Sequence, residues 1–226
     1  MRTKIHTIRM GLERCYIIQE KGIIMIDSGF KRSIRSFEKS IKRINIKPDE
    51  IILIVITHGH PDHIMSARDL KKLTGAKIVM HQADMKFLKE GLVAIPSGVR
   101  TLGHMLNRMF NIVSPLVHIP KTDVDIVVND DGLSLYEYGI SGKIIHTPGH
   151  SPGSISILLD TGDAFIGDLA VNIPPLHLKP GLPIFIDDLE QIKNSWKLLL
   201  NKGAKTIYPA HGKPFPADII RKIIGK

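Results

Sequence analysis

The turn at residues 57–63, T-H-G-H-P-D-H, holds three histidines and an aspartate within six residues. It directly follows a short, strongly apolar run, so these polar side chains should leave the end of a buried strand together. Imidazole and carboxylate groups are ligands that zinc, iron and manganese take in proteins. We expect His58 and His60 to face one ion, and Asp62 and His63, one step further round the turn, to face a second.

Four ligands from one turn cannot complete the coordination of two ions. Three later residues follow apolar segments in the same way and can supply the rest: His150 in a Gly/Pro loop, Asp168 after A-F-I-G, and His211 after I-Y-P-A. Gly59 is expected to leave room for the backbone close to the ions. The sequence therefore predicts a metal centre at one edge of a sheet.

Taken together, these segments resemble the metallo-β-lactamase fold family of hydrolases, whose signature is an H-x-H-x-D-H turn with a later His, Asp and His. The resemblance runs from about Tyr16 to Gly212, and Asp27 matches the family's early aspartate. It implies a binuclear centre in which two sets of three ligands share a bridging aspartate, while the early aspartate orients a ligand or the turn. The implied sets are His58, His60 and His150 on one ion and Asp62, His63 and His211 on the other, with Asp168 as the bridge.

Two divalent ions, zinc first and iron or manganese as alternatives, can hold a bridging hydroxide and polarise a carbonyl or phosphoryl oxygen. We therefore predict a metal-dependent hydrolase that cleaves an ester, thioester or lactone-type bond of a small molecule. Asp62 is the candidate to share or relay a proton. No side-chain nucleophile is needed, and Cys15, the single cysteine, is expected to be a buried apolar residue.

Differences between this chain and the patterns of particular family members narrow the range of candidate substrates. Lactone-hydrolysing members tend to carry a tyrosine three residues after the bridging aspartate, where this chain has Val171. Glyoxalase II-like members carry a basic C-terminal extension, whereas this chain ends 15 residues after His211, which disfavours a dedicated glutathione thioesterase. Two alternatives stay open: a mononuclear iron oxygenase of the persulfide-dioxygenase kind, and a phosphodiesterase or nuclease acting on nucleic acid.

The net charge of +9 permits a polyanionic partner without establishing one. Residues 31–47 carry seven basic side chains against one acidic, which is most simply the solvated face of an outer helix. Aromatic residues total only 5%, and none are interleaved with the basic residues for base stacking. Without an apolar run of membrane-spanning length or a signal peptide, we expect a cytoplasmic protein, with a homodimer possible.

The pattern of apolar residues predicts two βα halves packed sheet against sheet, with helices outside. The family resemblance implies that they form one α/β domain over residues 1–226, an αββα four-layer sandwich with the site along one edge of its two sheets. The run 51–56 should be buried on both faces. Strands are expected at 4–9, 14–19, 22–26, 51–56, 76–80, 125–128, 133–136, 140–146, 154–159, 164–166 and 206–208, and helices at 31–46, 61–73, 188–201 and 217–224.

An irregular segment at about 83–120 lengthens the gap between the ligand turn and His150. Within it, an apolar stripe at helical spacing predicts a helix that caps the site and lines an apolar substrate pocket; core packing and a dimer contact are the alternatives. The stripe consists of Leu102, Met105, Leu106, Met109 and Phe110. We expect Met105 and Met109 of this stripe to contact substrate. His177, in the P-P-L-H loop after the bridging aspartate, is a further candidate substrate contact.

Overall fold

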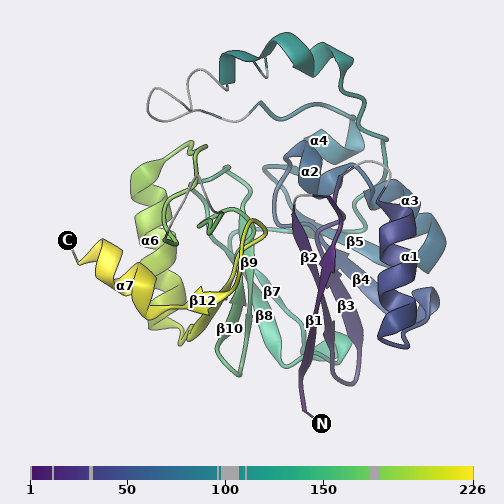
Figure 1. Cartoon of the computed structure of the whole chain (residues 1–226), viewed down its shortest axis with the longest axis horizontal. Coiled ribbons are helices and arrows are strands. Elements are labelled where there is room, and N and C mark those ends of the chain that lie inside the picture. Colours follow the sequence, from purple (N-terminus) through teal and green to yellow (C-terminus); the bar gives the residue numbers. More distant parts are fainter. Residues whose placement is uncertain are drawn as a thin grey trace.

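The computed structural model describes residues 2–11, 13–30, 33–95, 97, 107–109, 111–173 and 179–225. In this part of the chain two sheets pack against each other, and helices cover the outer side of each sheet (Figure 1). This is the αββα sandwich expected from the sequence.

The first sheet has the strand order β1-β2-β3-β4-β5-β6 among the described residues. Strand β2 pairs antiparallel with both β1 and β3, whereas β3 to β6 run parallel. The carboxyl ends of the parallel strands therefore meet at one edge of the sheet. The bounds are β1 Lys4–Arg9, β2 Arg14–Gln19, β3 Ile23–Ile26, β4 Ile51–Val55, β5 Lys77–His81 and β6 Ile126–Val128.

The second sheet has the order β12-β11-β10-β9-β8-β7 over the same described ranges. Its strands are antiparallel except for β10 and β11, which pair in parallel and so end at the same edge. The bounds are β7 Leu133–Ser134, β8 Gly142–His146, β9 Ile155–Leu159, β10 Asp163–Phe165, β11 Thr206–Tyr208 and β12 Phe215–Pro216.

Helices α1 and α3 flank the first sheet, α6 and α7 flank the second, and α2 and α4 lie at one end of the sandwich (Figure 1). Within the described ranges, no helix is both long and apolar enough to span a membrane. The bounds are α1 Ile34–Arg43, α2 Pro61–Ile64, α3 Ala67–Thr74, α4 Met85–Lys89, α6 Leu189–Asn201 and α7 Asp218–Ile224, with short 3₁₀ turns η1 Pro48–Glu50, η2 Ser114–Leu116 and η3 Tyr136–Tyr138.

Three apolar layers hold this arrangement together. Alternate residues of β2 separate two of them, because Ile17 packs under the helices of the first sheet while Tyr16 and Ile18 pack between the sheets. Phe37 of α1 and Trp196 of α6, both fully buried, anchor the two outer layers. Burial on both faces fixes the register of each sheet, and with it the positions of the strand ends.

Some element boundaries differ from the prediction. The helix expected at 61–73 is broken into α2 and α3, and at the break the Ser66 hydroxyl donates to the carbonyl of Phe30 (2.7 Å). The helix expected at 31–46 is shorter among the described residues. Full burial of 51–56 is wrong at one position, since Ile52 is 40% exposed. Helix α4 and strand β12 were not predicted.

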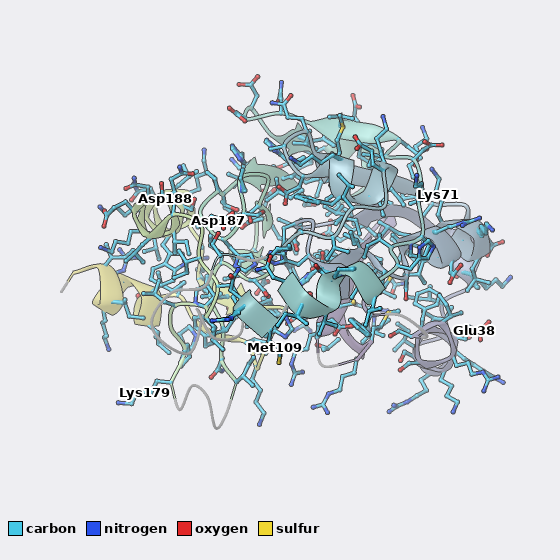
Figure 2. All side chains as sticks on the ribbon, turned by 90° about the horizontal axis from the view of Figure 1, so that it is seen from above. Glu38, Lys71, Met109, Lys179, Asp187 and Asp188 are labelled. Atoms are coloured by element: carbon cyan, nitrogen blue, oxygen red, sulfur yellow. The ribbon has the colours of Figure 1, made fainter. Side chains whose placement is uncertain are left out.

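The inserted segment contains helical residues at 107–109 and 111–113, followed by η2. This helix lies beyond α2 and α4 at the same end of the sandwich (Figure 1), and seen from above it crosses the middle of the molecule, with Met109 labelled (Figure 2). Met109 is 51% exposed, so its side chain is not packed in the core. The rest of the predicted stripe, Leu102, Met105, Leu106 and Phe110, lies outside the described residues.

Candidate metal centre

The ligand candidates emerge at the same offset from several strands. His58, Asp168 and His211 each lie three residues beyond the last residue of β4, β10 and β11, respectively. His150 lies in the loop after β8. Because these strand ends meet at one edge of the sandwich, residues up to 153 positions apart in the sequence converge there.

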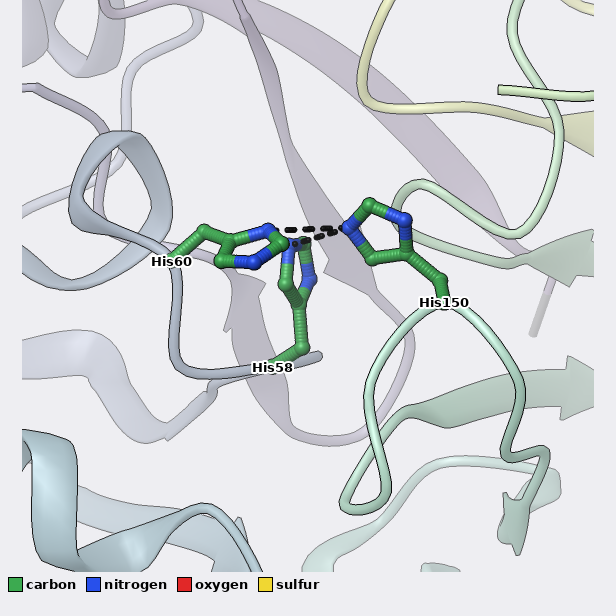
Figure 3. Close-up of side chains that lie close together, drawn as sticks. All are labelled: His58, His60 and His150. Atoms are coloured by element: carbon green, nitrogen blue, oxygen red, sulfur yellow. Dashed lines mark hydrogen bonds between the residues drawn. The ribbon is translucent and has the colours of Figure 1, made fainter. Parts of the chain in front are cut away.

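Three imidazoles form a compact, buried group, which we call the three-histidine group (Figure 3). The Nε2 atoms of His58 and His150 lie 3.1 Å apart, and His60 Nδ1 lies 3.0 Å from the former and 2.9 Å from the latter. Three nitrogens on a tetrahedral zinc ion would be separated by about 3.3 Å. The observed spacing is therefore close to that of three ligands around one ion.

Contacts behind these rings turn their free nitrogens inward. The Nδ1–H of His150 donates to the carbonyl of Phe185 (2.9 Å), and His58 Nδ1 lies 3.1 Å from Thr57 Oγ1. Burial, together with the neighbouring imidazoles, lowers the pKa of His58 well below its usual range and that of His60 to about 3. These rings are neutral at pH 7, which is the form that binds a metal ion.

The second group, which we call the Asp62 group, consists of Asp62, His63 and His211. His211 Nε2 lies 3.0 Å from Asp62 Oδ2, and His63 Nε2 lies 3.7 Å from the same oxygen. Asp168 connects the two groups, because its Oδ2 lies 3.8 Å from His150 Nε2 and 3.4 Å from His211 Nε2.

Asp27 lies behind the ligand turn. Its carboxylate accepts hydrogen bonds from the Thr57 backbone N–H (2.8 Å) and hydroxyl (2.9 Å), and it lies 2.9 Å from His63 Nδ1. Its backbone adopts a φ of 60°, which is uncommon for a residue other than glycine. With Nδ1 engaged by Asp27, His63 directs Nε2 toward the carboxylates of Asp62 and Asp168, each 3.7 Å away.

The charges of the Asp62 group are strongly coupled. Burial opposes protonation of His211, but the carboxylates of Asp168 and Asp62 outweigh it and raise its pKa to about 9. Burial also disfavours the Asp62 carboxylate, yet His63 and His211 lower its pKa to about 2. Without a metal ion, protons on the histidines therefore balance the two carboxylates, and a divalent ion can replace those protons.

A family model described as the metallo-beta-lactamase superfamily matches residues 10–211 of this chain. The chain belongs to the metallo-β-lactamase superfamily. Proteins of this superfamily are generally metal-dependent hydrolases. The family resemblance stated from the ligand turn and the later His, Asp and His is thereby confirmed.

Several members of the superfamily are related to this chain at modest sequence identity. A protein of Methanocaldococcus jannaschii, described as a probable metallo-hydrolase, is 29% identical over 206 residues, covering 88% of this chain and 86% of its own. The hydroxyacylglutathione hydrolase GloC of Haemophilus influenzae is 29% identical over 175 residues, covering 75% and 72% of the two chains.

Solved structures share the fold. A metallo-beta-lactamase superfamily protein from Sulfolobus tokodaii superposes with a TM-score of 0.68 at 21% identity, covering all of this chain and 86% of the other. A metallo-beta-lactamase family protein from Thermus thermophilus gives a TM-score of 0.68 at 17% identity, covering 99% and 78%. These likenesses agree with the four-layer architecture described above.

One buried carboxylate of this superfamily member was missed from the sequence. Asp84 follows β5 by three residues, the same offset as His58 and Asp168, and that offset could have revealed it.

The role predicted for Gly59 also needs correction: a Cβ atom there would lie 2.4 Å from the ring of Phe87, so the glycine makes room for α4 rather than for an ion.

A further group of titratable residues, His81, Asp130 and His146, differs from the metal centre because hydrogen bonds already occupy its polar atoms. The N–H of Ala83 donates to His81 Nδ1 and His146 Nε2–H donates to the carbonyl of Pro152, while the remaining nitrogens each lie 3.2 Å from Asp130.

Of the residues predicted to contact substrate, Met105 and His177 lie outside the described residues.

Proposed function

We propose that this chain is a binuclear metal-dependent hydrolase that cleaves an ester, thioester or lactone-type bond in a small molecule, with zinc as its expected metal. The proposal rests on two adjoining groups of candidate ligands, the three-histidine group and the Asp62 group, each of which matches one half of the signature. Asp168 lies within 3.8 Å of a histidine of each group. Seven ligands are more than one ion can take at a tetrahedral site, and they suffice for two.

Two atoms in particular support metal binding at this centre. His63 Nε2 and Asp168 Oδ1 are buried and lack a hydrogen-bond partner among the described residues. Leaving such atoms unpaired costs about 1–3 kcal/mol each, and more where a charge is involved. They lie 3.7 Å apart, His63 within the Asp62 group and Asp168 beside it, so a cation bound there would satisfy both.

The residues of the site divide the chemistry between them. When bound, two divalent ions supply a nucleophile from water near neutral pH and stabilise the negative charge that develops on the attacked carbonyl oxygen. The side chain of Asp62 is 32% exposed, whereas those of Asp168 and His211 are 12% and 14% exposed. Asp62 is therefore the carboxylate best placed to accept a proton from a reactant that enters from solvent.

Cys15 does not provide a competing nucleophile. It is fully buried, and burial together with nearby carboxylates raises the pKa of its thiol well above the usual range. At pH 7 it remains a thiol, which is a poor nucleophile. We therefore assign no acyl-enzyme on Cys15 to the proposed hydrolysis.

Two features favour an acyl substrate: the name of one relative and the apolar surface of the inserted segment. GloC, named as a hydroxyacylglutathione hydrolase, acts on a thioester, which favours thioesters within the proposed range. The helical residues 107–109 and 111–113 and the following turn present Met109, Ile112 and Leu116 as exposed apolar side chains. We assign this segment as a cap that contacts an apolar acyl group.

The mononuclear iron alternative uses the equivalents of His58, His150 and Asp168. It would leave the buried His63 Nε2 without an ion or a hydrogen-bond partner, and we therefore prefer the binuclear assignment.

The proposal is tested with zinc-loaded protein on a panel of aryl esters, acyl thioesters, lactones and phosphodiesters. We expect turnover of acyl substrates that is lost with a chelator, nearly abolished in Asp62→Ala and largely retained in Cys15→Ala. An acyl group trapped on a side chain, or oxygen-dependent turnover with bound iron, would overturn the proposal.

A further inference from the structure

Asp84 lies between the two segments that supply the three-histidine group. It is completely buried and follows β5, whereas His58 and His60 follow β4 and His150 follows β8 of the other sheet. No part of the hydrolytic chemistry proposed above uses it.

The Asp84 carboxylate accepts three hydrogen bonds from these segments. Its Oδ2 accepts from the backbone N–H of Gly59 (2.9 Å) and from the hydroxyl of Ser151 (2.7 Å), and its Oδ1 accepts from the backbone N–H of Gly153 (2.9 Å). Gly59 stands between His58 and His60, and Ser151 follows His150. One carboxylate thus connects the immediate neighbours of all three imidazoles.

Helix α4 begins directly after Asp84, but the Asp84 carboxylate does not cap this helix. Asp84 is the N-cap residue of α4, a position where aspartate normally accepts a hydrogen bond from the first turn of its own helix. Here its side chain makes no capping hydrogen bond. The side chain contacts the ligand segments instead, so the helix forgoes the stabilisation that a capping aspartate normally gives.

We propose that Asp84 is a positioning residue that holds the ligand turn and the His150 loop at the separation required for one metal ion. Hydrogen bonds to an ionised carboxylate are shorter and stronger than neutral ones, so three of them fix both segments relative to each other. The inference rests on the metal centre of the proposed function and extends it to the residue that sets the geometry of the three-histidine group. The Asp62 group has its own support, Asp27, and does not depend on Asp84.

Asp84→Asn tests this directly, because it keeps the shape of the side chain but places an amide where a carboxylate accepted hydrogen bonds. In chelator competition with zinc, we expect one ion to bind about 10- to 100-fold more weakly, as for other residues that orient metal ligands, while the other is unchanged. The weakened ion is identified with cobalt, whose visible spectrum in Asp84→Asn should match that of His150→Ala and differ from that of His211→Ala.

The control is Asp130→Asn, at an aspartate that lies 3.2 Å from His81, the last residue of β5, and from His146, the last residue of β8. Among the described residues it makes no hydrogen bond to the ligand turn or to residues 150–153. It should keep both affinities. If Asp84→Asn folds poorly, Ser151→Ala removes one of the three hydrogen bonds and should weaken the same ion by a smaller factor.

Equal weakening of both ions in Asp84→Asn, or no weakening, would overturn the positioning role. Failure of the proposed hydrolysis would be distinguishable, because the affinities are measured without substrate.

Discussion

At the scale of single residues, the metal centre depends on side chains behind the ligands as much as on the ligands. Both carboxylate oxygens of Asp27 contact the ligand turn through Thr57, and one of them faces His63 Nδ1. Removing the charge should therefore misorient one ligand histidine while leaving the rest of the centre intact.

Asp27→Asn tests this role without disturbing the backbone, because asparagine tolerates the positive φ of this position. We expect the free energy of unfolding of the metal-free protein to fall by about 1–3 kcal/mol. The ion of the Asp62 group should bind about 10- to 100-fold more weakly. Urea denaturation and zinc competition measure the two effects, with the exposed Asp49→Asn as control. Unchanged zinc affinity would show that Asp27 only shapes the turn.

The ligand candidates could be predicted from the sequence because their residue types and their places after apolar strands are local features. His58, Asp168 and His211 show both. Asp84 could not be assigned its contacts in this way, since its partners Gly59 and Ser151 lie 25 and 67 positions away. Only the packing of β5 against β4, and of one sheet against the other, brings them together.

At the scale of elements, short strands rich in β-branched and other apolar residues were predicted well. Strands β1, β2 and β11 begin and end at the expected residues. The break between α2 and α3 was not predictable, because it involves Ser66 bonding to Phe30, which no local pattern encodes. Helix α4 spans only five residues, too few to show a helical period.

The inserted segment yields a prediction at this scale. If the helical residues 107–109 and 111–113 cap the site, Met109→Ala should raise KM for acyl substrates with long apolar tails several-fold. It should have little effect on short-chain substrates and leave metal content unchanged. Each methylene removed from such a contact is worth about 0.8 kcal/mol. Val127→Ala, at a residue of β6 that is 50% exposed against 51% for Met109, is the matched control. A change confined to the melting temperature or to the oligomeric state would assign the segment to packing or to an interface instead.

At the scale of the whole molecule, the buried histidines link stability to pH. In the metal-free protein, burial lowers the pKa of His60 to about 3, from an ordinary value of 6.5. Below about pH 6.5 the unfolded chain therefore binds protons that the folded chain does not, and stability falls on acidification. His211 has the opposite shift, to about 9, so its contribution is full below pH 6.5 and is lost as the pH rises through 9.

We therefore expect the urea midpoint of the metal-free protein to be highest near pH 6.5 and to decrease on both sides. Zinc should remove the alkaline decrease, because the bound ion requires the deprotonated form of His211. The difference in melting temperature between zinc-loaded and metal-free protein should widen from pH 6.5 to 9, and His211→Ala should reduce that widening. A metal-free protein equally stable from pH 5 to 9 would contradict the assignment of these charges.

The number of divalent ions bound per chain, measured by elemental analysis after saturation with zinc and removal of free metal, tests the binuclear centre most directly. We expect close to two ions in the wild type, about one in His211→Ala, which loses a ligand of the Asp62 group only, and less than one in Asp168→Ala, which loses the residue that reaches both groups. His118→Ala, at a histidine outside both groups, should retain two. A wild-type protein that never holds more than one ion, or an Asp168→Ala variant that keeps both, would contradict the account.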